Sequence, residues 1–491
     1  MRTDEGYRAG RAVWHAVAGR HLRPDVWDHG RAGEDRLMPI ASVNPATGRT
    51  DRTFEPHDDA EIEARLALAA EAFESYRATS FDERARWAVA AAELLEGELP
   101  VLARILTMEM GKTFAAAKGE VAKCAAAFRY YAAHAEAMLA EEPVVLDSGT
   151  GAVRYEPTGP VLAVMPWNFP LWQVVRFAAP ALMAGNVGLL KHASNVPQTA
   201  LALEELLVRA GFPQGAFQVL LVPSTAVAGI VADDRVRAVT LTGSEAAGRS
   251  VAEAAGRALK KTVLELGGSD PFVVLPSADL ARAATVAVEA RVQNNGQSCI
   301  AAKRFIVHQD CYDEVVDAMV AAMAALTVGD PMDPGTEVGP LATAAGRDEV
   351  AAQVADARAK GATVLCGGAA IPGEGWFYAP TVLSDLSPGM RVHDEEVFGP
   401  VALVYRAHDV ADAVRIANDT GFGLGASVWT TDPVEQEVVV AGLRAGMVFV
   451  NAMVVSMPEL PFGGVKRSGY GRELSHQGIR EFCDVKAIRR A

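Results

Sequence analysis

Apolar residues follow two different periods along the chain, and the change of period divides it. From residue 58 to about residue 140 they recur at helical spacing, with Ile62, Leu66 and Phe73 on one face, which predicts a layer of helices. Short strand-like runs then alternate with helical segments. The predicted strands are 152–155, 161–165, 187–190, 217–222, 238–241 and 262–264, and the predicted helices are 199–210, 226–232 and 245–259. Such alternation predicts a parallel sheet covered by helices.

A second series of apolar runs follows at 272–275, 304–307, 401–405 and 447–450. Two α/β units in one chain predict two lobes with a cleft between them. Residues 1–37 mix charged side chains with little periodicity, so we interpret them as a peripheral extension. The chain closes on a strand-like run at 482–488.

Composition and charge exclude several classes of protein. With 491 residues, half of them hydrophobic, the chain has material for two or three domains. A net charge of -15 argues against binding a nucleic-acid backbone. Five cysteines without a CxxC pair suggest neither a disulfide framework nor a zinc site, and no apolar run is long enough to cross a membrane. We expect a cytoplasmic protein with no metal site and no nucleic-acid or membrane partner.

Cys299 is the strongest candidate nucleophile. It lies in a Gly-Gln-Ser-Cys turn just before a new apolar stretch, where backbone amides are expected to lower its pKa. Free cysteines are more often small buried core residues, but the polar run from Gln293 to Ser298 favours the functional interpretation.

Glu265 and Asn168 are candidates for the chemistry around such a nucleophile. Glu265 ends the run Thr262-Val263-Leu264 and precedes two glycines, a position from which a carboxylate can act as a general base; a helix cap or an ion pair is the alternative. Asn168 lies in the loop PWNFP, where its amide could donate to an oxyanion or simply satisfy loop carbonyls.

Two further strand ends suit a nucleotide. Lys191 follows the run 187–190 and suits a ribose hydroxyl or a phosphate, although a solvated lysine is the commoner case. Gly243-Ser244 joins a strand to a helix, which places amide donors at a phosphate and also makes Ser244 a helix cap. No GxGxxG fingerprint is present, so an ordinary dinucleotide motif is not indicated.

Seven motifs in this order resemble the aldehyde dehydrogenase superfamily: PWNFP, LKHAS, LTGS, LELGGSDPF, NNGQSC, EEVFGPV and PFGGVKRSGYGRE. The resemblance covers the chain from Met38 onward. Within the superfamily, the segments around Asn168 and Cys299 are similar to bacterial succinate-semialdehyde dehydrogenases, particularly the actinobacterial NADP-dependent type.

The resemblance implies a mechanism and a set of site residues. Cys299 attacks the aldehyde, Asn168 and the Cys299 amide hold the oxyanion, and the thiohemiacetal yields hydride and a thioester. Glu265 activates the water that releases the acid, and Glu396 binds the nicotinamide ribose. The implied cofactor contacts are Trp167, Asn168, Lys191, His192, Ala193, Ser194, Gly243, Ser244, Leu266, Glu396 and Phe398.

Cofactor and substrate choice rest on fewer residues. Ser194 stands where NAD-preferring relatives commonly have an acidic residue, so NADP is favoured and NAD is possible. Arg176 and Ser456 match contacts that resembling enzymes make with a distal carboxylate. Gln293 departs from relatives that have a second arginine, so the substrate is expected to be succinate semialdehyde or another short ω-carboxy aldehyde. A broader NAD(P) aldehyde dehydrogenase is the alternative.

The resemblance also implies a domain plan and partners. A modified Rossmann cofactor domain is expected at 38–136 and 158–266, an α/β catalytic domain at 267–456, and a β oligomerisation arm with the C-terminal segment at 137–157 and 457–491. An arm with free strand edges implies a homodimer or homotetramer. A cofactor-free thiol hydrolase would leave Lys191, Ser194 and Glu396 unexplained, and a non-catalytic protein would not need nucleophile, base and oxyanion donor together.

Overall fold

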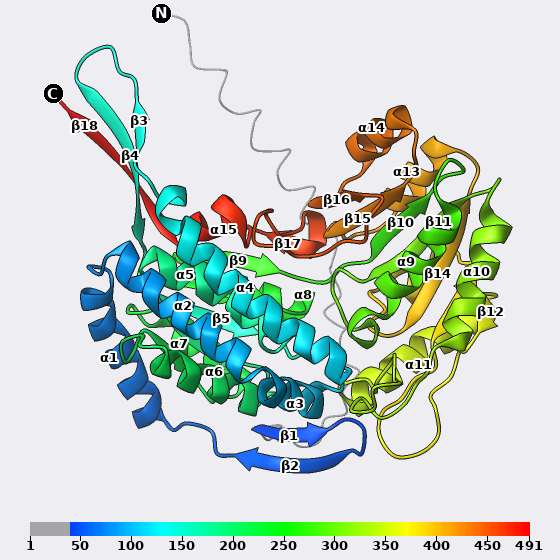
Figure 1. The fold of residues 1–491 in the computed structure, drawn as a ribbon, viewed down its shortest axis with the longest axis horizontal. Coiled ribbons are helices and arrows are strands. Elements are labelled where there is room, and N and C mark those ends of the chain that lie inside the picture. The colour runs from blue at the N-terminus through cyan, green and yellow to red at the C-terminus, as the bar shows by residue number, and fades with distance from the viewer. Residues whose placement is uncertain (1–39) are drawn as a thin grey trace, which may run out of the picture. The chain divides into compact units, whose positions relative to one another are not determined.

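A six-stranded and a seven-stranded sheet organise residues 40–491, the part of the chain that this computed structural model describes (Figure 1). The predicted extension over residues 1–37 lies outside the described residues. The six-stranded sheet has the order β17-β9-β8-β5-β6-β7 and is parallel except for β17. Its strands are β5 (Pro160–Met165), β6 (Val187–His192), β7 (Phe217–Val219), β8 (Ala238–Thr242), β9 (Lys261–Glu265) and β17 (Gly469–Tyr470).

The seven-stranded sheet has the order β12-β13-β14-β11-β10-β15-β16, with β12 as an antiparallel edge strand. Its strands are β10 (Asp270–Val274), β11 (Ala302–His308), β12 (Thr363–Cys366), β13 (Thr381–Ser384), β14 (Val401–Ala407), β15 (Gly425–Trp429) and β16 (Met447–Val450). Two mainly parallel sheets with covering helices confirm the predicted α/β fold class.

Four helices precede the first large sheet, as the periodicity of residues 58–140 predicts. They are α1 (Asp59–Tyr76), α2 (Phe81–Gly97), α3 (Leu99–Met110) and α4 (Phe114–Met138). Capping boxes of Asp58 with Glu61 and of Ser80 with Glu83 begin α1 and α2. Gly111, at φ 83°, ends α3. Helix α4 packs on α2 and on α5, which brings its inner face to the site described below.

The remaining helices cover the two large sheets. They are α5 (Trp172–Ala184), α6 (Pro197–Arg209), η1 (Ser224–Ala226), α7 (Val227–Ala232), α8 (Glu245–Arg257), α9 (Leu280–Val292), η2 (Gln293–Gly296), α10 (Tyr312–Ala325), α11 (Ala344–Ala359), α12 (Arg391–Asp394), α13 (Val410–Asn418), α14 (Pro433–Gly442), η3 (Lys466–Ser468) and α15 (Ser475–Glu481). Among residues 40–491, no helix has both the length and the hydropathy needed to cross a membrane.

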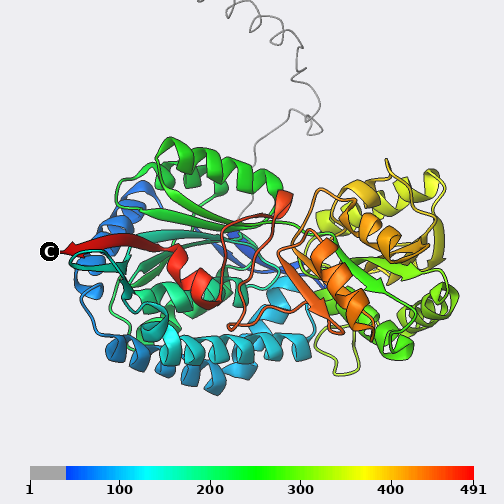
Figure 2. The same ribbon diagram turned by 90° about the horizontal axis from the view of Figure 1, so that it is seen from above.

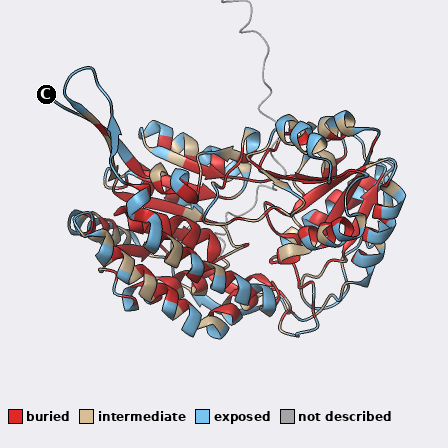
Figure 3. Cartoon of the chain, turned by 45° about the horizontal axis from the view of Figure 1, so that its top comes forward, coloured by how far each residue is buried: buried red, intermediate tan, exposed pale blue. Residues whose placement is uncertain are grey.

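The core lies on both faces of the sheets (Figure 3). Every residue of α5 is buried, and so are five of the six residues of β5. A strand whose sheet is covered on both faces carries a continuous apolar run, since its side chains do not reach water on either face. The predicted strand 217–222 is wrong in its second half: β7 ends at Val219, where its ladder with β6 stops at the Leu190–Val219 pair.

A three-stranded sheet of order β18-β4-β3 lies apart from the two large ones and contains the C-terminus (Figures 1 and 2). It consists of β3 (Glu142–Val144), β4 (Thr150–Pro157) and β18 (Cys483–Arg490), and a separate hairpin joins β1 (Ile40–Asn44) to β2 (Arg49–Phe54). Most residues of β18 are exposed. The division into cofactor domain, catalytic domain and oligomerisation arm stays a prediction.

Candidate active site

Two neighbouring cavities between the large sheets share Cys299. One, of about 280 Å³, is lined by the end of β8 (Thr242, Gly243, Ser244) and by Trp167, Asn168, Leu266, Glu396 and Phe398; we call it the β8 cavity. The other, of about 210 Å³, is lined by α4 (Ala116, Gly119, Glu120, Lys123) and by Trp172, Arg176, Gln293 and Ser456; we call it the α4 cavity. Cys299 and Gln173 line both cavities. A group bonded to the Cys299 sulfur can therefore be reached from the β8 cavity and from the α4 cavity.

The loop that carries Cys299 has an unusual backbone. Asn294 and Asn295 adopt left-handed conformations at φ 56° and 58°, which asparagine tolerates better than most residues. Lys303 on β11 then donates from Nζ to the carbonyls of Ser298 (2.8 Å) and Cys299 (2.6 Å). A buried lysine therefore anchors the nucleophile's backbone to the sheet.

The Cys299 thiol differs from its expected state. Burial raises its pKa to about 12, against the opposing influence of Arg176 and Lys303. The expectation that backbone amides lower this pKa is wrong, because loss of hydration disfavours the thiolate more than nearby cations favour it. The resting group is a protonated thiol.

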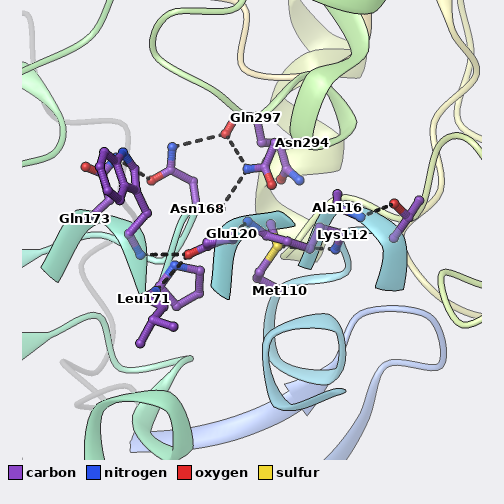
Figure 4. A network of polar contacts seen from close by, with 12 residues as sticks. Met110, Lys112, Ala116, Glu120, Asn168, Leu171, Gln173, Asn294 and Gln297 are labelled. Atoms are coloured by element: carbon purple, nitrogen blue, oxygen red, sulfur yellow. Dashed lines mark hydrogen bonds and ion pairs between the residues drawn. The ribbon is translucent and has the colours of Figure 1, made fainter. Parts of the chain in front are cut away.

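Asn168 lies in the loop that precedes α5, beside the Cys299 loop (Figure 4). Its Nδ2 donates to the Gln297 carbonyl at 3.1 Å, and Asn294 Nδ2 donates to the Asn168 carbonyl (2.7 Å) and to the same Gln297 carbonyl (3.0 Å). The two loops, far apart in sequence, are thus fastened together, and the Asn168 amide faces the loop of the nucleophile.

A buried ion pair supports the same region from α4 (Figure 4). Glu120 Oε2 pairs with Lys112, and both side chains are only 1% exposed. Glu120 Oε1 accepts from the backbone N–H groups of Leu171 and Trp172, each at 2.9 Å. A carboxylate at a helix start satisfies its free N–H groups, so Glu120 holds the beginning of α5 and with it the Asn168 loop. No motif singles out this pair; its sequence signal is Glu120 within the Ala-rich helix α4, with Lys112 shortly before the helix.

Glu265 ends β9 as predicted, but its carboxyl group lines neither cavity. Within residues 40–491 both of its oxygens are buried without a hydrogen-bond partner. Burial, followed by the charge of Glu473, raises its pKa well above the usual range. The structure therefore places Glu265 behind the site, in an environment that favours the protonated acid.

The β8 cavity gathers seven of the predicted cofactor contacts. Ser244 caps α8, accepting from Ala247 N–H at 3.3 Å, and Trp167 packs edge-on against Phe398 at 5.7 Å. Glu396 Oε1 pairs with Lys303 (3.1 Å) and accepts from Gly268 N–H (3.2 Å).

Gly267 lies against the Glu396 carboxylate, so a side chain at this position would displace that carboxylate. A Cβ at this position would lie 2.4 Å from the Glu396 carboxylate, closer than side-chain contacts allow. The close approach keeps Glu396 at the cavity wall.

The other four predicted cofactor contacts lie at the end of β6, outside that cavity. Lys191 is buried, and burial lowers its pKa. His192 Nε2 donates to the Pro170 carbonyl (2.8 Å) and its Nδ1 accepts from Ala193 N–H (2.9 Å); burial lowers its pKa to about 4, so it is neutral and braces the Asn168 loop. Ala193 and Trp167 pack against the same small apolar cluster, which contains Val196, and the Ser194 carbonyl accepts from Ala41 N–H.

Arg176 and Ser456, the predicted substrate contacts, both line the α4 cavity. Arg176 forms an ion pair with Glu473, donates to Thr242 Oγ1 at 3.3 Å and lies over the Phe462 ring at 4.1 Å. Lys123, which the motifs did not point to, also lines this cavity and donates to Ser456 Oγ at 2.7 Å.

Comparison with known proteins identifies the family that this sequence matches. Residues 32–488 match the model of the "Aldehyde dehydrogenase family". The NADP-dependent succinate-semialdehyde dehydrogenase 1 of Mycobacterium tuberculosis is 62% identical over 92% of this chain and 99% of its own, and the corresponding enzyme of Mycobacterium avium is 62% identical over 92% and 96%. The crystal structure of the Streptococcus pyogenes succinic semialdehyde dehydrogenase in complex with NADP+ is 38% identical, with a TM-score of 0.90 over 91% of this chain and 99% of that one.

Proposed function

Because the chain belongs to the aldehyde dehydrogenase family, we propose that it oxidises succinate semialdehyde, or a similar short ω-carboxy aldehyde, to the acid with NADP. One observation carries the proposal: Cys299 lies in the wall shared by the β8 cavity and the α4 cavity. A nucleophile in that position can hold an aldehyde on one side while the other side presents an acceptor. A thiol hydrolase would need only one of the two cavities.

The residues present fit NADP. Lys191 is a buried cation for which burial alone shifts the pKa, without a neighbouring carboxylate, and Ser194 beside it carries no negative charge, so a 2′-phosphate meets no repulsion there. The start of α8 at Ser244 suits a pyrophosphate, and Glu396 suits a ribose hydroxyl. When bound, the oxidised nicotinamide supplies a hydride acceptor.

The roles of the chain's own side chains follow from their positions. Cys299 must lose its proton and attack the aldehyde carbon, giving a thiohemiacetal whose oxyanion the Asn168 amide stabilises. Oxidation of that adduct leaves a thioester on Cys299.

Glu265 then has to turn about its side-chain torsions to reach water near the thioester. In its buried position the group keeps its proton, and in the open cavity the carboxylate is favoured, so Glu265 must release that proton on turning into the cavity. There its carboxylate accepts a proton from the water that attacks the thioester.

We also propose a homodimer or homotetramer in a reducing compartment such as the cytoplasm. Strand β18 has a free edge beyond its pairing with β4, and Val485 on it is 67% exposed; a second copy of this sheet would cover both. All five cysteines are free, which suits a reducing environment.

The test is the near-ultraviolet absorbance of reduced nicotinamide. Purified protein is mixed with succinate semialdehyde and either NADP or NAD, beside a Cys299→Ala control. Formation of NADPH that disappears in the control, and that exceeds formation of NADH, is the expected result. Folded, reduced protein that forms neither product from succinate semialdehyde would reject the proposal.

A further inference from the structure

Three contacts meet at the ammonium group of Lys303. The side chain is buried on β11. Its Nζ donates to the carbonyls of Ser298 at 2.8 Å and Cys299 at 2.6 Å, and it lies 3.1 Å from Glu396 Oε1. An ammonium has three N–H donors, so these contacts use all of them. One cation therefore joins the backbone of the nucleophile to a carboxylate in the wall of the β8 cavity.

The earlier carbonyls of the Cys299 loop have anchors of their own. The Gly296 carbonyl accepts from the buried Arg291 side chain at 2.6 Å, and the Gln297 carbonyl accepts from two asparagine amides. Replacing Lys303 therefore frees only the last two carbonyls of the loop. The loop remains tied to its surroundings at Gly296 and Gln297, so we expect variants at position 303 to fold.

The charged groups that face Cys299 act in opposite directions. Burial raises the pKa of its thiol to about 12; Arg176 on α5 and Lys303 on β11 oppose this rise, whereas Glu396, between α12 and β14, and Asp270 on β10 add to it. A cation that pairs with a carboxylate transmits less of its charge to a third group, because the two fields partly cancel. The positive charge that Lys303 presents to the sulfur therefore depends on Glu396.

Glu396 connects this charge to the β8 cavity, which it lines. We propose that Lys303 is a positioning residue that holds the Cys299 peptide and stabilises its thiolate with a positive charge, and that Glu396 limits this stabilisation as the counter-ion of Lys303. The carboxylate proposed for the ribose is thus also the counter-ion of the lysine behind the nucleophile. This inference rests on the proposed function, because it names the groups that set the reactivity of the nucleophile in that reaction.

The test follows alkylation of Cys299 by iodoacetamide in the full-length protein, measured by peptide mass spectrometry. The thiolate is the form that reacts, so at about pH 8 the rate is proportional to the small fraction of thiolate. Lys303→Met keeps a flexible side chain and removes the charge. We expect alkylation about 3- to 30-fold slower than in the wild-type protein, because a shift of one pKa unit changes that fraction about tenfold.

Glu396→Gln should change the rate in the opposite direction. It keeps an oxygen that can accept from Gly268 N–H, now at 3.2 Å, and removes the negative charge, so we expect alkylation about 3- to 30-fold faster. Every anchor of the Cys299 loop stays in place, so this variant tests the proposal even where Lys303→Met does not fold. Unchanged or slower alkylation in Glu396→Gln would overturn the proposal.

The direction of the change in Lys303→Met separates charge from anchoring. A lysine that acted only as an anchor would, once lost, loosen the loop and expose the Cys299 sulfur, so alkylation would become faster. Unchanged or faster alkylation in Lys303→Met would therefore also overturn the proposal. Arg176 and Asp270 are present in every variant, so the differences in rate report the pair of Lys303 and Glu396.

Two further variants complete the set. Glu395→Gln removes a carboxylate from the neighbouring residue, which pairs with Arg391 at 2.8 Å, and should change the rate less than about twofold, since exposed charges are screened. Lys303→Met combined with Glu396→Gln removes both charges, so its rate should lie between those of the two single variants. Acceleration in Glu395→Gln equal to that in Glu396→Gln, or a double variant slower than Lys303→Met, would contradict the role of Glu396.

The alkylation experiment needs neither aldehyde nor NADP, so it fails independently of the proposed function. The expected order of rates, in a wild-type protein that forms no NADPH from succinate semialdehyde, would reject the proposed function and support the role of Lys303. Formation of NADPH by the wild-type protein, with an alkylation rate that neither charge changes, would reject the role of Lys303 and leave the proposed function intact.

Discussion

Replacing Asn168 with alanine should remove the donor that we propose for the oxyanion on the way to the thiohemiacetal. Asn168 Nδ2 now donates to the Gln297 carbonyl at 3.1 Å, and Asn294 Nδ2 donates to that carbonyl at 3.0 Å. When Asn168 turns to a substrate oxygen, Gln297 therefore keeps one donor, and no buried carbonyl is left unpaired. This rotation of the Asn168 side chain exchanges one hydrogen bond for another, so it costs only a small part of the ~0.5–1.5 kcal/mol that a neutral hydrogen bond contributes.

Asn168→Ala should therefore show almost the full loss of rate that removal of an oxyanion donor causes. Loss of such a donor lowers kcat about 10²- to 10³-fold, or about 2.7–4 kcal/mol, and KM should change less than about threefold because the contact strengthens only in the transition state. The assay is the initial rate of NADPH formation at saturating succinate semialdehyde.

A matched variant separates donation from positioning. Asn294→Gly keeps a residue that accepts the left-handed backbone at φ 56° but removes the amide that holds the Asn168 carbonyl. We expect a loss of about tenfold, between wild type and Asn168→Ala. A kcat for Asn168→Ala within tenfold of wild type, with Cys299→Ala inactive, would refute Asn168 as the oxyanion donor.

Three other predictions follow from buried and charged groups. With the pKa of Cys299 near 12, alkylation of that thiol by iodoacetamide in cofactor-free protein should accelerate about tenfold per pH unit from pH 7 to 10, as followed by peptide mass spectrometry; a plateau below pH 9 would contradict this. Lys112→Met should cost about 3–5 kcal/mol by leaving Glu120 buried and unpaired, seen as a lower Tm that adding Glu120→Gln partly restores; an unchanged Tm would show that the pair contributes little. Ser194→Glu should lower kcat/KM for NADP about tenfold or more relative to NAD, because a carboxylate repels the 2′-phosphate; an unchanged ratio would place that phosphate elsewhere.

The strands that the sequence predicted share one physical property. Runs such as 161–165 and 187–190 became β5 and β6, because a parallel strand covered on both faces needs uninterrupted apolar residues. Strand β15, Gly425–Trp429, begins with Gly-Ala-Ser and is equally buried, yet these small residues have weak β propensity. Its pairing with β10 and β16 determines its conformation, and sequence spacing does not show that pairing.

Some properties of the site could likewise be predicted from the sequence and others could not. Cys299 and Asn168 could be identified from their motifs, since the loop residues around each are distinctive, and the structure lines one cavity with both. The pKa of Cys299 could not be predicted from its motif, because it depends on how much water the folded chain removes from the sulfur. The position of the Glu265 carboxyl group behind the site also depends on a side-chain torsion that no motif specifies.

The charge of the substrate cavity shows most clearly why motifs alone are insufficient. Matching residue by residue selects Arg176, because an arginine eight positions after Asn168 resembles a known carboxylate contact. Whether that arginine can attract a substrate depends on Glu473, which lies far along the chain and pairs with it in the fold. Burial raises the pKa of Glu473, and Arg176 opposes that shift, so the charge that the arginine presents to the cavity depends on the protonation of a carboxyl group that no motif places beside it.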